Sequence, residues 1–248
     1  MLMEPFELLH ESWSLYRKHL WSLVGYSAWM LLPVGALFLL TFAPDHWLVF
    51  VVAMLCTLVE IYLGLWMTVA VARSVTRFSQ KQEVNPTAIS HESLLRIPSL
   101  LRTAMLQALV VIGGLLLFVI PGIVFTVWYA FAQLATVLDE KRPIEALTFS
   151  KLLVKGRFWA VAWRLTSVPI VIALIYATVM GLLVTAFSTY TGADPEFLLG
   201  TEGPSWVPLM DAIVQVFLIP FLLTYSVLLF QDLKKHPVEP LDKGCDVA

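Results

Sequence analysis

Long apolar runs separated by short polar stretches dominate the pattern along the chain. Six runs approach the roughly 20 residues that a helix needs to cross the hydrocarbon core of a bilayer. They cover residues 20–42, 47–72, 103–120, 123–138, 165–187 and 208–230. Tryptophan and tyrosine lie near several of their ends, as an interfacial belt requires. The pattern predicts six transmembrane helices.

The third and fourth runs meet at Pro121-Gly122, which either kinks one long helix or turns the chain back. If the chain reverses there, all 16 lysine and arginine residues fall on one side of the membrane. Without a reversal, the six basic residues between 141 and 164 would fall on the other side. Because basic residues concentrate in cytoplasmic loops, the sequence predicts a reversal and places both termini in the cytoplasm.

Three segments that precede the odd-numbered runs share a register. Each begins with proline and carries serine seven residues later, as Pro5 and Ser12, Pro86 and Ser93, and Pro143 and Ser150. The first two also share the sequence His-Glu-Ser at the same offset. Proline is favoured in the first turn of a helix, where its missing N–H would be unpaired anyway. We therefore expect three short amphipathic helices on the cytoplasmic surface.

These segments predict an internal repeat of three units, each a surface helix followed by a transmembrane hairpin. The units would cover residues 5–80, 86–140 and 143–235, and residues 236–248 would form a flexible tail. The first surface helix has an apolar face formed by Phe6, Leu9, Trp13, Tyr16 and Leu20. The alternative is that any basic interfacial helix before a span shows such a pattern. The expected fold is an all-α membrane protein, with one integral membrane domain over residues 1–248.

Composition supports this fold class and narrows the chemistry. Hydrophobic residues make up 59% of the chain and charged residues 14%, against roughly 25% charged in an ordinary soluble domain. The net charge of −2 gives no reason to expect a nucleic-acid partner. Cys56 and Cys245 form neither a disulfide framework nor a metal cluster. The charged residues before the first run predict an uncleaved membrane anchor rather than a signal peptide.

Glu60 is the most unusual polar residue, because it is expected midway through the second span. A charge at the centre of a membrane helix costs at least about 2.5 kcal/mol on insertion scales, so an ionisable residue there is a functional candidate. It could exchange a proton or anchor a polar ligand. The alternative is a carboxyl that hydrogen-bonds a neighbouring helix, through Gln215, Tyr62 or a backbone carbonyl.

Gln133, Asp211 and Gln215 are the other polar residues expected inside spans. Together with Glu60 they would line a polar path, or each would satisfy a hydrogen bond between helices. The two His-Glu-Ser sequences invite a catalytic interpretation, but acid–base catalysis needs such groups close together in a pocket. Their repeated positions favour a polar surface face. The five histidines lack metal-ligand spacing, so we expect no catalytic site, metal or cofactor.

Residues 100–165 resemble a known family. The resemblance is carried by Ile120-Pro121-Gly122-Ile123, Trp128, Asp139-Glu140, Glu145-Ala146-Leu147, Ser150, Leu152, Gly156 and Trp159. This stretch resembles the bacterial YciC-like inner-membrane proteins and is similar to the membrane domain fused to some glycerophosphodiester phosphodiesterases. The resemblance implies a six-span fold and a multi-pass location in the bacterial inner (plasma) membrane. The phosphodiesterase chemistry belongs to a separate soluble domain and is not implied.

The favoured function hypothesis is a non-enzymatic inner-membrane protein that organises the membrane or acts as an accessory component. Its expected partners are membrane lipids, especially anionic headgroups at the cytoplasmic face, which basic loops attract. A protein partner or a second copy of the chain stays open. The alternative is a small transporter or permease that uses Glu60 in a midplane polar site. A membrane-embedded enzyme ranks last, because Glu60 is the one clear reactive group within the spans.

Overall fold

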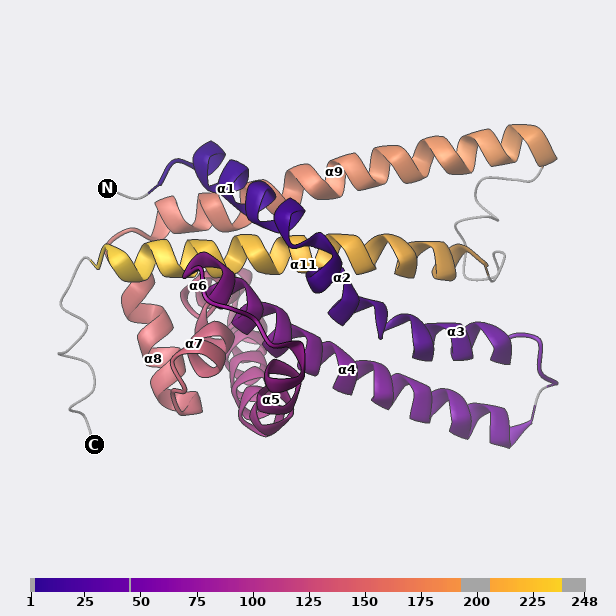
Figure 1. Cartoon of the computed structure of the whole chain (residues 1–248), viewed down its shortest axis with the longest axis horizontal. Coiled ribbons are helices and arrows are strands. Elements are labelled where there is room, and N and C mark those ends of the chain that lie inside the picture. Colours follow the sequence, from indigo (N-terminus) through magenta and orange to yellow (C-terminus); the bar gives the residue numbers. More distant parts are fainter. Residues whose placement is uncertain (1–2, 45, 193–205, 238–248) are drawn as a thin grey trace.

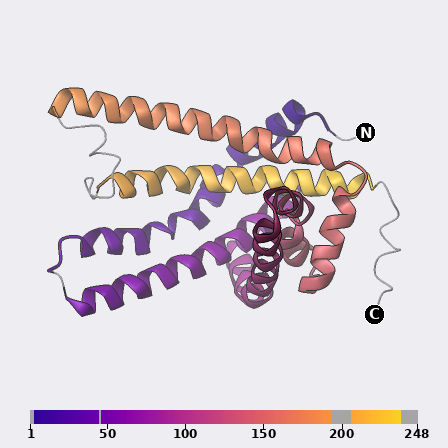
Figure 2. The same ribbon diagram turned by 180° about the vertical axis from the view of Figure 1, so that it is seen from behind.

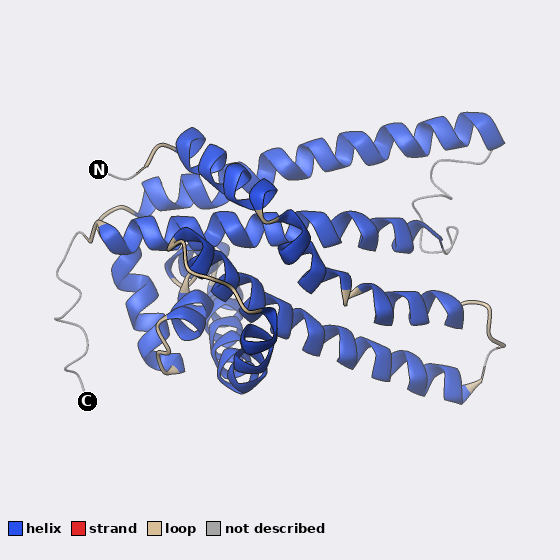
Figure 3. Cartoon of the chain, viewed as in Figure 1, coloured by secondary structure: helices blue, strands red, loops and turns tan. Residues whose placement is uncertain are grey.

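The computed structural model describes residues 3–44, 46–192 and 206–237, and these residues form helices and loops without a β-strand (Figure 3). Cys245 and most of the expected tail lie outside the described residues. The helices are α1 (Pro5–Lys18), α2 (Leu20–Ala28), α3 (Leu31–Leu40), α4 (Trp47–Ser79), α5 (Pro86–Leu117), α6 (Val119–Trp128), α7 (Ala132–Leu138), α8 (Pro143–Val154), α9 (Phe158–Thr191) and α11 (Trp206–Lys235).

Six helical stretches are long and apolar enough to cross a membrane, which confirms this part of the predicted fold. Four of them lie within single long helices, α4, α5, α9 and α11. The first stretch combines α2 and α3, and the fourth combines α6 and α7. Pro33 lies in the first turn of α3, where its missing N–H leaves no helical hydrogen bond unmade.

One end of the molecule is a compact bundle that we call the hub, comprising residues 3–18, 66–103, 131–168 and 216–237 (Figure 1). Its core combines side chains from five helices that are almost fully shielded from solvent: Leu8, Val69, Ala135, Leu153 and Leu229. Burial of apolar surface is the main favourable term in such packing. The hub therefore ties together segments from both ends and the middle of the chain.

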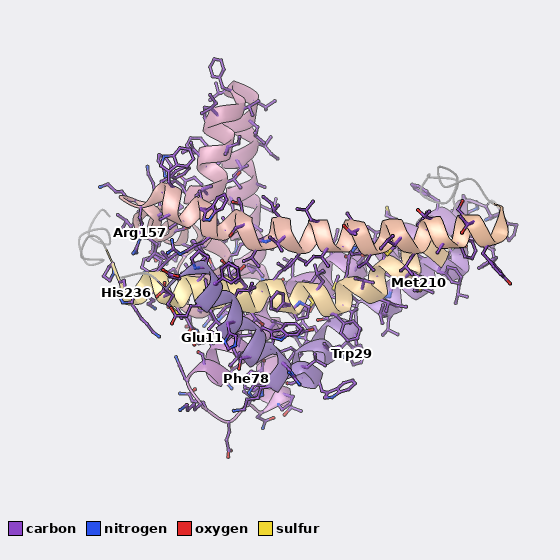
Figure 4. The ribbon with its side chains drawn as sticks, turned by 90° about the horizontal axis from the view of Figure 1, so that it is seen from above. Glu11, Trp29, Phe78, Arg157, Met210 and His236 are labelled. Carbon is purple, nitrogen blue, oxygen red and sulfur yellow. The ribbon has the colours of Figure 1, made fainter. Side chains whose placement is uncertain are left out.

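Two apolar groups of helices extend from the hub. One comprises α3, α9 and the N-terminal parts of α4 and α11, which run in one general direction (Figure 1). The other is the α5–α6 hairpin, which runs crosswise, seen end-on in Figures 1 and 2 and lengthwise at the top of Figure 4. Both groups expose large apolar side chains, such as Phe50 and Leu182 in the first and Leu116 and Phe118 in the second. Extended apolar surfaces of this kind mark contact with a membrane or a partner.

The chain reverses between α5 and α6, as the charge pattern predicts, but the turn lies at Phe118 rather than at Pro121-Gly122. Phe118 has an extended backbone, with φ −160° and ψ 150°. Pro121 and Gly122 lie in the first turn of α6 instead. The first four N–H groups of a helix have no intrahelical acceptor, so proline fits there without breaking the helix.

The two limbs of this hairpin approach closely at two glycines. A Cβ atom added at Gly114 would lie 2.6 Å from Cδ2 of Phe125, and one added at Gly122 would lie 2.3 Å from Cδ2 of Leu115. The backbones are also close here, because Cα of Gly122 lies 3.2 Å from the Cβ position of Gly114. Small residues allow this kind of close helix packing.

Gly114→Ala is expected to lower the free energy of unfolding by about 1–3 kcal/mol, the usual cost of overpacking. Gly113→Ala is the matched control, because nothing lies within 4 Å of a Cβ atom there. In that variant, the greater helix propensity of alanine adds up to about 1 kcal/mol of stability. Denaturant unfolding in detergent micelles measures both variants, and equal stabilities would contradict the close crossing.

The second expected surface helix is not a separate element. α5 runs unbroken for 32 residues through Pro98, so the surface segment and the span form one helix. α1 and α8 are separate short helices, as expected. In α1, however, Phe6 is 85% exposed and Trp13 is 52% exposed, whereas Tyr16 is buried. The expected apolar face is therefore divided between the hub and the surroundings of the protein.

Candidate functional site

Glu60 lies on the apolar part of α4, half-exposed between exposed residues such as Val59 and Ile61. It makes no hydrogen bond or ion pair with any side chain in the described part of the chain. The two side chains that the sequence suggested as partners, Gln215 and Tyr62, are not bonded to it. The structure thus gives Glu60 no polar site among the described residues.

Asp211 of α11 accepts hydrogen bonds from Gln215, one turn later on the same helix, and from Tyr176 of α9. Nε2 of Gln215 donates to Oδ2 of Asp211 at 2.6 Å, and the Tyr176 hydroxyl donates to Oδ1. Both carboxylate oxygens therefore have a donor. The three residues line a mainly apolar cleft of about 290 Å³ between α9 and α11, walled by residues such as Pro169 and Leu218.

Tyr176 was not singled out in the sequence, although a signal was present. It lies within the fifth apolar run, as Asp211 lies near the start of the sixth. Consecutive spans run in opposite directions, so the later part of one lies beside the early part of the next. A phenol and a carboxylate at matching depths are candidates for the same hydrogen bond.

Gln133 joins α7 of the hub to α5. Its Nε2 donates to Oε1 of Gln107 on α5 at 3.2 Å. One turn away, the hydroxyls of Thr103 and Thr136 lie 2.9 Å apart in a buried pair. Gln133 therefore satisfies a hydrogen bond between α5 and α7, one of its two expected roles. The structure does not bring Glu60, Gln133 and the Asp211–Gln215 pair together in one path.

The three proline–serine segments occupy equivalent positions in their helices. Pro5, Pro86 and Pro143 each begin a helix. The positions three, seven and eleven residues later are buried in all three helices: Leu8, Ser12 and Tyr16; Ile89, Ser93 and Ile97; Ala146, Ser150 and Val154. This spacing follows one face of a helix with 3.6 residues per turn. The three starts are therefore alike, while the repeat of whole units stays a prediction.

The three serines differ in what they bind. The hydroxyls of Ser12 and Ser93 each donate to a carbonyl four residues earlier in their own helix, at 2.7 and 2.6 Å. The hydroxyl of Ser150 instead bonds two backbone groups outside its own helix. It donates to the carbonyl of Trp128 at 2.7 Å and accepts the N–H of Phe131 at 3.1 Å. Ser150 thereby bridges the break between α6 and α7.

Ion pairs link the helix ends on one side of the hub. Arg73 and Arg77 of α4 bind Glu92 of α5, at 2.7 and 2.9 Å. Glu140, in the turn before α8, pairs with Arg96 and lies 3.5 Å from Arg73. From the sequence, these arginines were expected to be loop charges that attract lipid, and their carboxylate partners were not predicted. Glu92 lies 19 and 15 residues from Arg73 and Arg77, and Glu140 lies in a different loop, before α8. Spacing along the sequence alone could therefore not identify these pairs.

The N-terminal segment is held against α9 and α11. The N–H of Met3 donates to Oδ2 of Asp232 at 3.1 Å, and Nε and Nη2 of Arg164 donate to the Met3 carbonyl. The Tyr16 hydroxyl donates to the Phe217 carbonyl at 2.8 Å. Burial raises the pKa of Tyr16 to about 12, so this hydroxyl keeps its proton at neutral pH.

Arg157 holds the end of α11. Its guanidinium donates to the carbonyls of Leu233 and His236, at 3.0 and 2.5 Å. Burial lowers the pKa of Arg157, although the Asp232 carboxylate opposes that shift. Figure 4 labels Arg157 and His236 close together at the hub end, far from Met210. The start of α9 and the end of α11 therefore meet in the hub.

Neither a search for metal-binding side chains nor comparison with known proteins indicates a further site. Within residues 3–44, 46–192 and 206–237, no group of three or more His, Cys, Asp or Glu side chains could hold a metal ion. Cys56 is a free thiol on α4. No family model, curated protein or solved structure matches the chain.

Proposed function

We propose that this chain is a multi-pass membrane protein that serves as a non-enzymatic organising or accessory component, with its hub at the cytoplasmic face. The observation that carries the proposal is the division of its surface. Every lysine and arginine of the described residues belongs to the hub, whereas the far ends of the long helices carry none. Basic residues gather on the cytoplasmic side of membrane proteins. Both termini would then be cytoplasmic.

The proposal has two forms, which differ in whether the α5–α6 hairpin crosses the bilayer. The sequence predicts that the runs 103–120 and 123–138, which lie mainly in α5 and in α6 with α7, also cross the bilayer, for six spans in all. One flat bilayer cannot lie perpendicular to both groups of helices, so their crosswise direction instead favours a hairpin that lies along the membrane beside the hub and does not cross it (Figure 1). Because a hairpin returns to the side from which it starts, both forms leave the two termini on the same side.

Anionic lipids of the cytoplasmic leaflet are the proposed partners. α1 presents exposed Phe6 and Trp13 together with exposed Arg17 and Lys18. An apolar face beside basic residues is what an interfacial helix needs to lie on anionic lipid. The proposed location is the bacterial inner membrane, in keeping with the resemblance to YciC-like proteins. A partner protein or a second copy could cover the same surfaces.

The transporter alternative has weaker support. Its proposed midplane site relied on Glu60, which has no polar partner within the described chain. The cleft at Asp211 is the observation that favours this alternative, but both oxygens of that carboxylate already accept hydrogen bonds, from Tyr176 and Gln215. Hydrogen bonds of this kind hold helices together in membranes. The organising role therefore remains the first candidate.

Cysteine labelling tests the orientation. In a variant that carries Cys56→Ala and Cys245→Ala, a single Phe42→Cys marks the far end of the long helices and a single His236→Cys marks the hub. We expect an impermeant maleimide to label intact bacterial spheroplasts at position 42 and not at position 236. Opening the membrane should expose position 236. The reverse pattern would place the hub outside and overturn the proposal.

Deletion of the whole chain from cells distinguishes the organising role from the transporter alternative. Cells without the chain should show an altered phospholipid composition or altered membrane-protein complexes, both restored by the wild-type chain. Unchanged lipids and complexes, combined with solute uptake by reconstituted vesicles across a panel of substrates, would instead establish the transporter.

A further inference from the structure

A pocket of about 710 Å³ opens on the hub beside the base of the α5–α6 hairpin. Its charged lining comes from α4, α5 and the turn before α8: Arg73, Glu92, Arg96, Arg102 and Glu140. Leu95 and Pro98 of α5 form an apolar edge. The pocket lies where the charged part of α5 gives way to its apolar part, which begins at residue 103.

The charge of this pocket is not balanced. Three arginines face two glutamates within it, and Arg77 adds a fourth guanidinium, bound to Glu92 at 2.9 Å. These six groups carry a net charge of +2 when all are ionised. Glu92 is shared between Arg73 and Arg77, and Glu140 is shared between Arg73 and Arg96. The carboxylates are too few to satisfy the guanidiniums, so the pocket favours an anion.

Unused hydrogen-bond donors point to the same conclusion. Nε of Arg102 donates to the carbonyl of Pro98 at 3.1 Å, and its two terminal nitrogens have no acceptor in the described part of the chain. Nε of Arg73 is buried and has no acceptor there either. A guanidinium offers five N–H donors in a planar fork that matches the oxygens of a phosphate group.

An apolar track continues from the pocket along α5. Leu95 and Arg102 share one face of this helix, seven residues apart. Further along this face, Met105, Leu109 and Leu116 are 65%, 70% and 83% exposed. A ligand with a phosphate at one end and hydrocarbon at the other could therefore contact the arginines and the track together.

We propose that this pocket binds a phosphate group, with Arg102 and Arg96 as its principal ligands. The phosphate comes from an anionic phospholipid headgroup or from free phosphate, and the apolar track favours the lipid. Glu140 competes with the phosphate for Arg96 and Arg73, because its carboxylate occupies the same donors. The lipid form rests on the proposed function, which sets the hub against the cytoplasmic leaflet.

The experiment uses the full chain in a neutral detergent, titrated with short-chain phosphatidylglycerol, short-chain phosphatidylcholine or inorganic phosphate. Native mass spectrometry counts the bound molecules. The variants are Arg102→Gln, Glu140→Gln and the control Lys81→Gln, which removes one positive charge from the exposed turn after α4. Far-ultraviolet circular dichroism of each variant checks that the helices are retained.

We expect wild-type protein to prefer phosphatidylglycerol to phosphatidylcholine, whose choline ammonium repels the arginines. Arg102→Gln should weaken phosphatidylglycerol binding about tenfold, as loss of a charge-assisted hydrogen bond does. Glu140→Gln should tighten it severalfold, because it frees two guanidiniums. Lys81→Gln should leave it within about twofold. Opposite effects of two charge-changing variants cannot result from unfolding.

The remaining outcomes separate the sources and the two proposals. If inorganic phosphate follows the pattern of the variants and phosphatidylglycerol does not, the site binds free phosphate. If the wild type prefers phosphatidylglycerol but Arg102→Gln and Lys81→Gln weaken it equally, the attraction is diffuse and the pocket is overturned while the proposed function stands. If the wild type neither distinguishes the lipids nor binds phosphate, the site and the proposed lipid partner both fail.

Discussion

Ser150→Ala is expected to lower the free energy of unfolding by about 2–4 kcal/mol, because it leaves two backbone groups without partners. The break between α6 and α7 frees the carbonyl of Trp128 and the N–H of Phe131 from helical hydrogen bonds. The Ser150 hydroxyl binds both, at 2.7 and 3.1 Å, from a side chain that is fully buried. Water cannot readily replace it there. Alanine would therefore also weaken the attachment of α8 to the hairpin.

The equivalent serines supply the control for this prediction. Ser12→Ala and Ser93→Ala each remove a hydroxyl that binds a carbonyl within its own helix. The backbone keeps that carbonyl bonded, so each change should cost less than about 1 kcal/mol. Unfolding of the three variants by denaturant in detergent micelles provides the comparison. Equal losses at the three positions would show that Ser150 has no special bridging role.

Phe118→Cys, in the same cysteine-free variant, is expected to resist an impermeant maleimide from both sides of the membrane. The α5–α6 hairpin runs crosswise to the long helices (Figure 1), so it is expected to lie along the membrane beside the hub rather than to reach the far side. The tip of the hairpin is exposed and apolar, with Phe118 at 75% and Ile120 at 75%. It should therefore end within the lipid.

The backbone of the turn is compatible with a position in the lipid. The N–H of Phe118 donates to the Gly114 carbonyl at 3.0 Å, and the N–H of Gly122 donates to the Phe118 carbonyl at 3.4 Å. Polar backbone groups in hydrocarbon must be satisfied within the protein. Phe42→Cys is the positive control, labelled from outside. Labelling of position 118 from the outside would instead establish the six crossings that the sequence predicts.

The helices were largely predictable because helix formation and apolar length are local properties. A segment that enters lipid must bond its own backbone groups, so a long uncharged run already indicates a helix. Proline likewise located three helix starts, at Pro5, Pro86 and Pro143. The reversal followed from charge placement, but its position at Phe118 did not. It depends on the close approach at Gly114 and Gly122, which brings together two helices.

The polar residues show the limit of the sequence most clearly. Asp211 and Gln133 were identified as polar groups within spans, but their partners Tyr176 and Gln107 are 35 and 26 residues away. Glu60 resembled these two residues in its sequence context, but it has no such partner in the described structure. Whether a buried or half-buried polar group is satisfied depends on which helices lie beside it.

By itself, the sequence determined which segments are helical and apolar and where the positive charge gathers, because each of these depends on a residue and its near neighbours. The tertiary structure alone decided the crosswise direction of the α5–α6 hairpin and the grouping of Arg73, Arg96 and Arg102 with Glu92 and Glu140. Hydrogen bonds and ion pairs act over a few ångströms. They are set by the packing of segments that are distant in the chain.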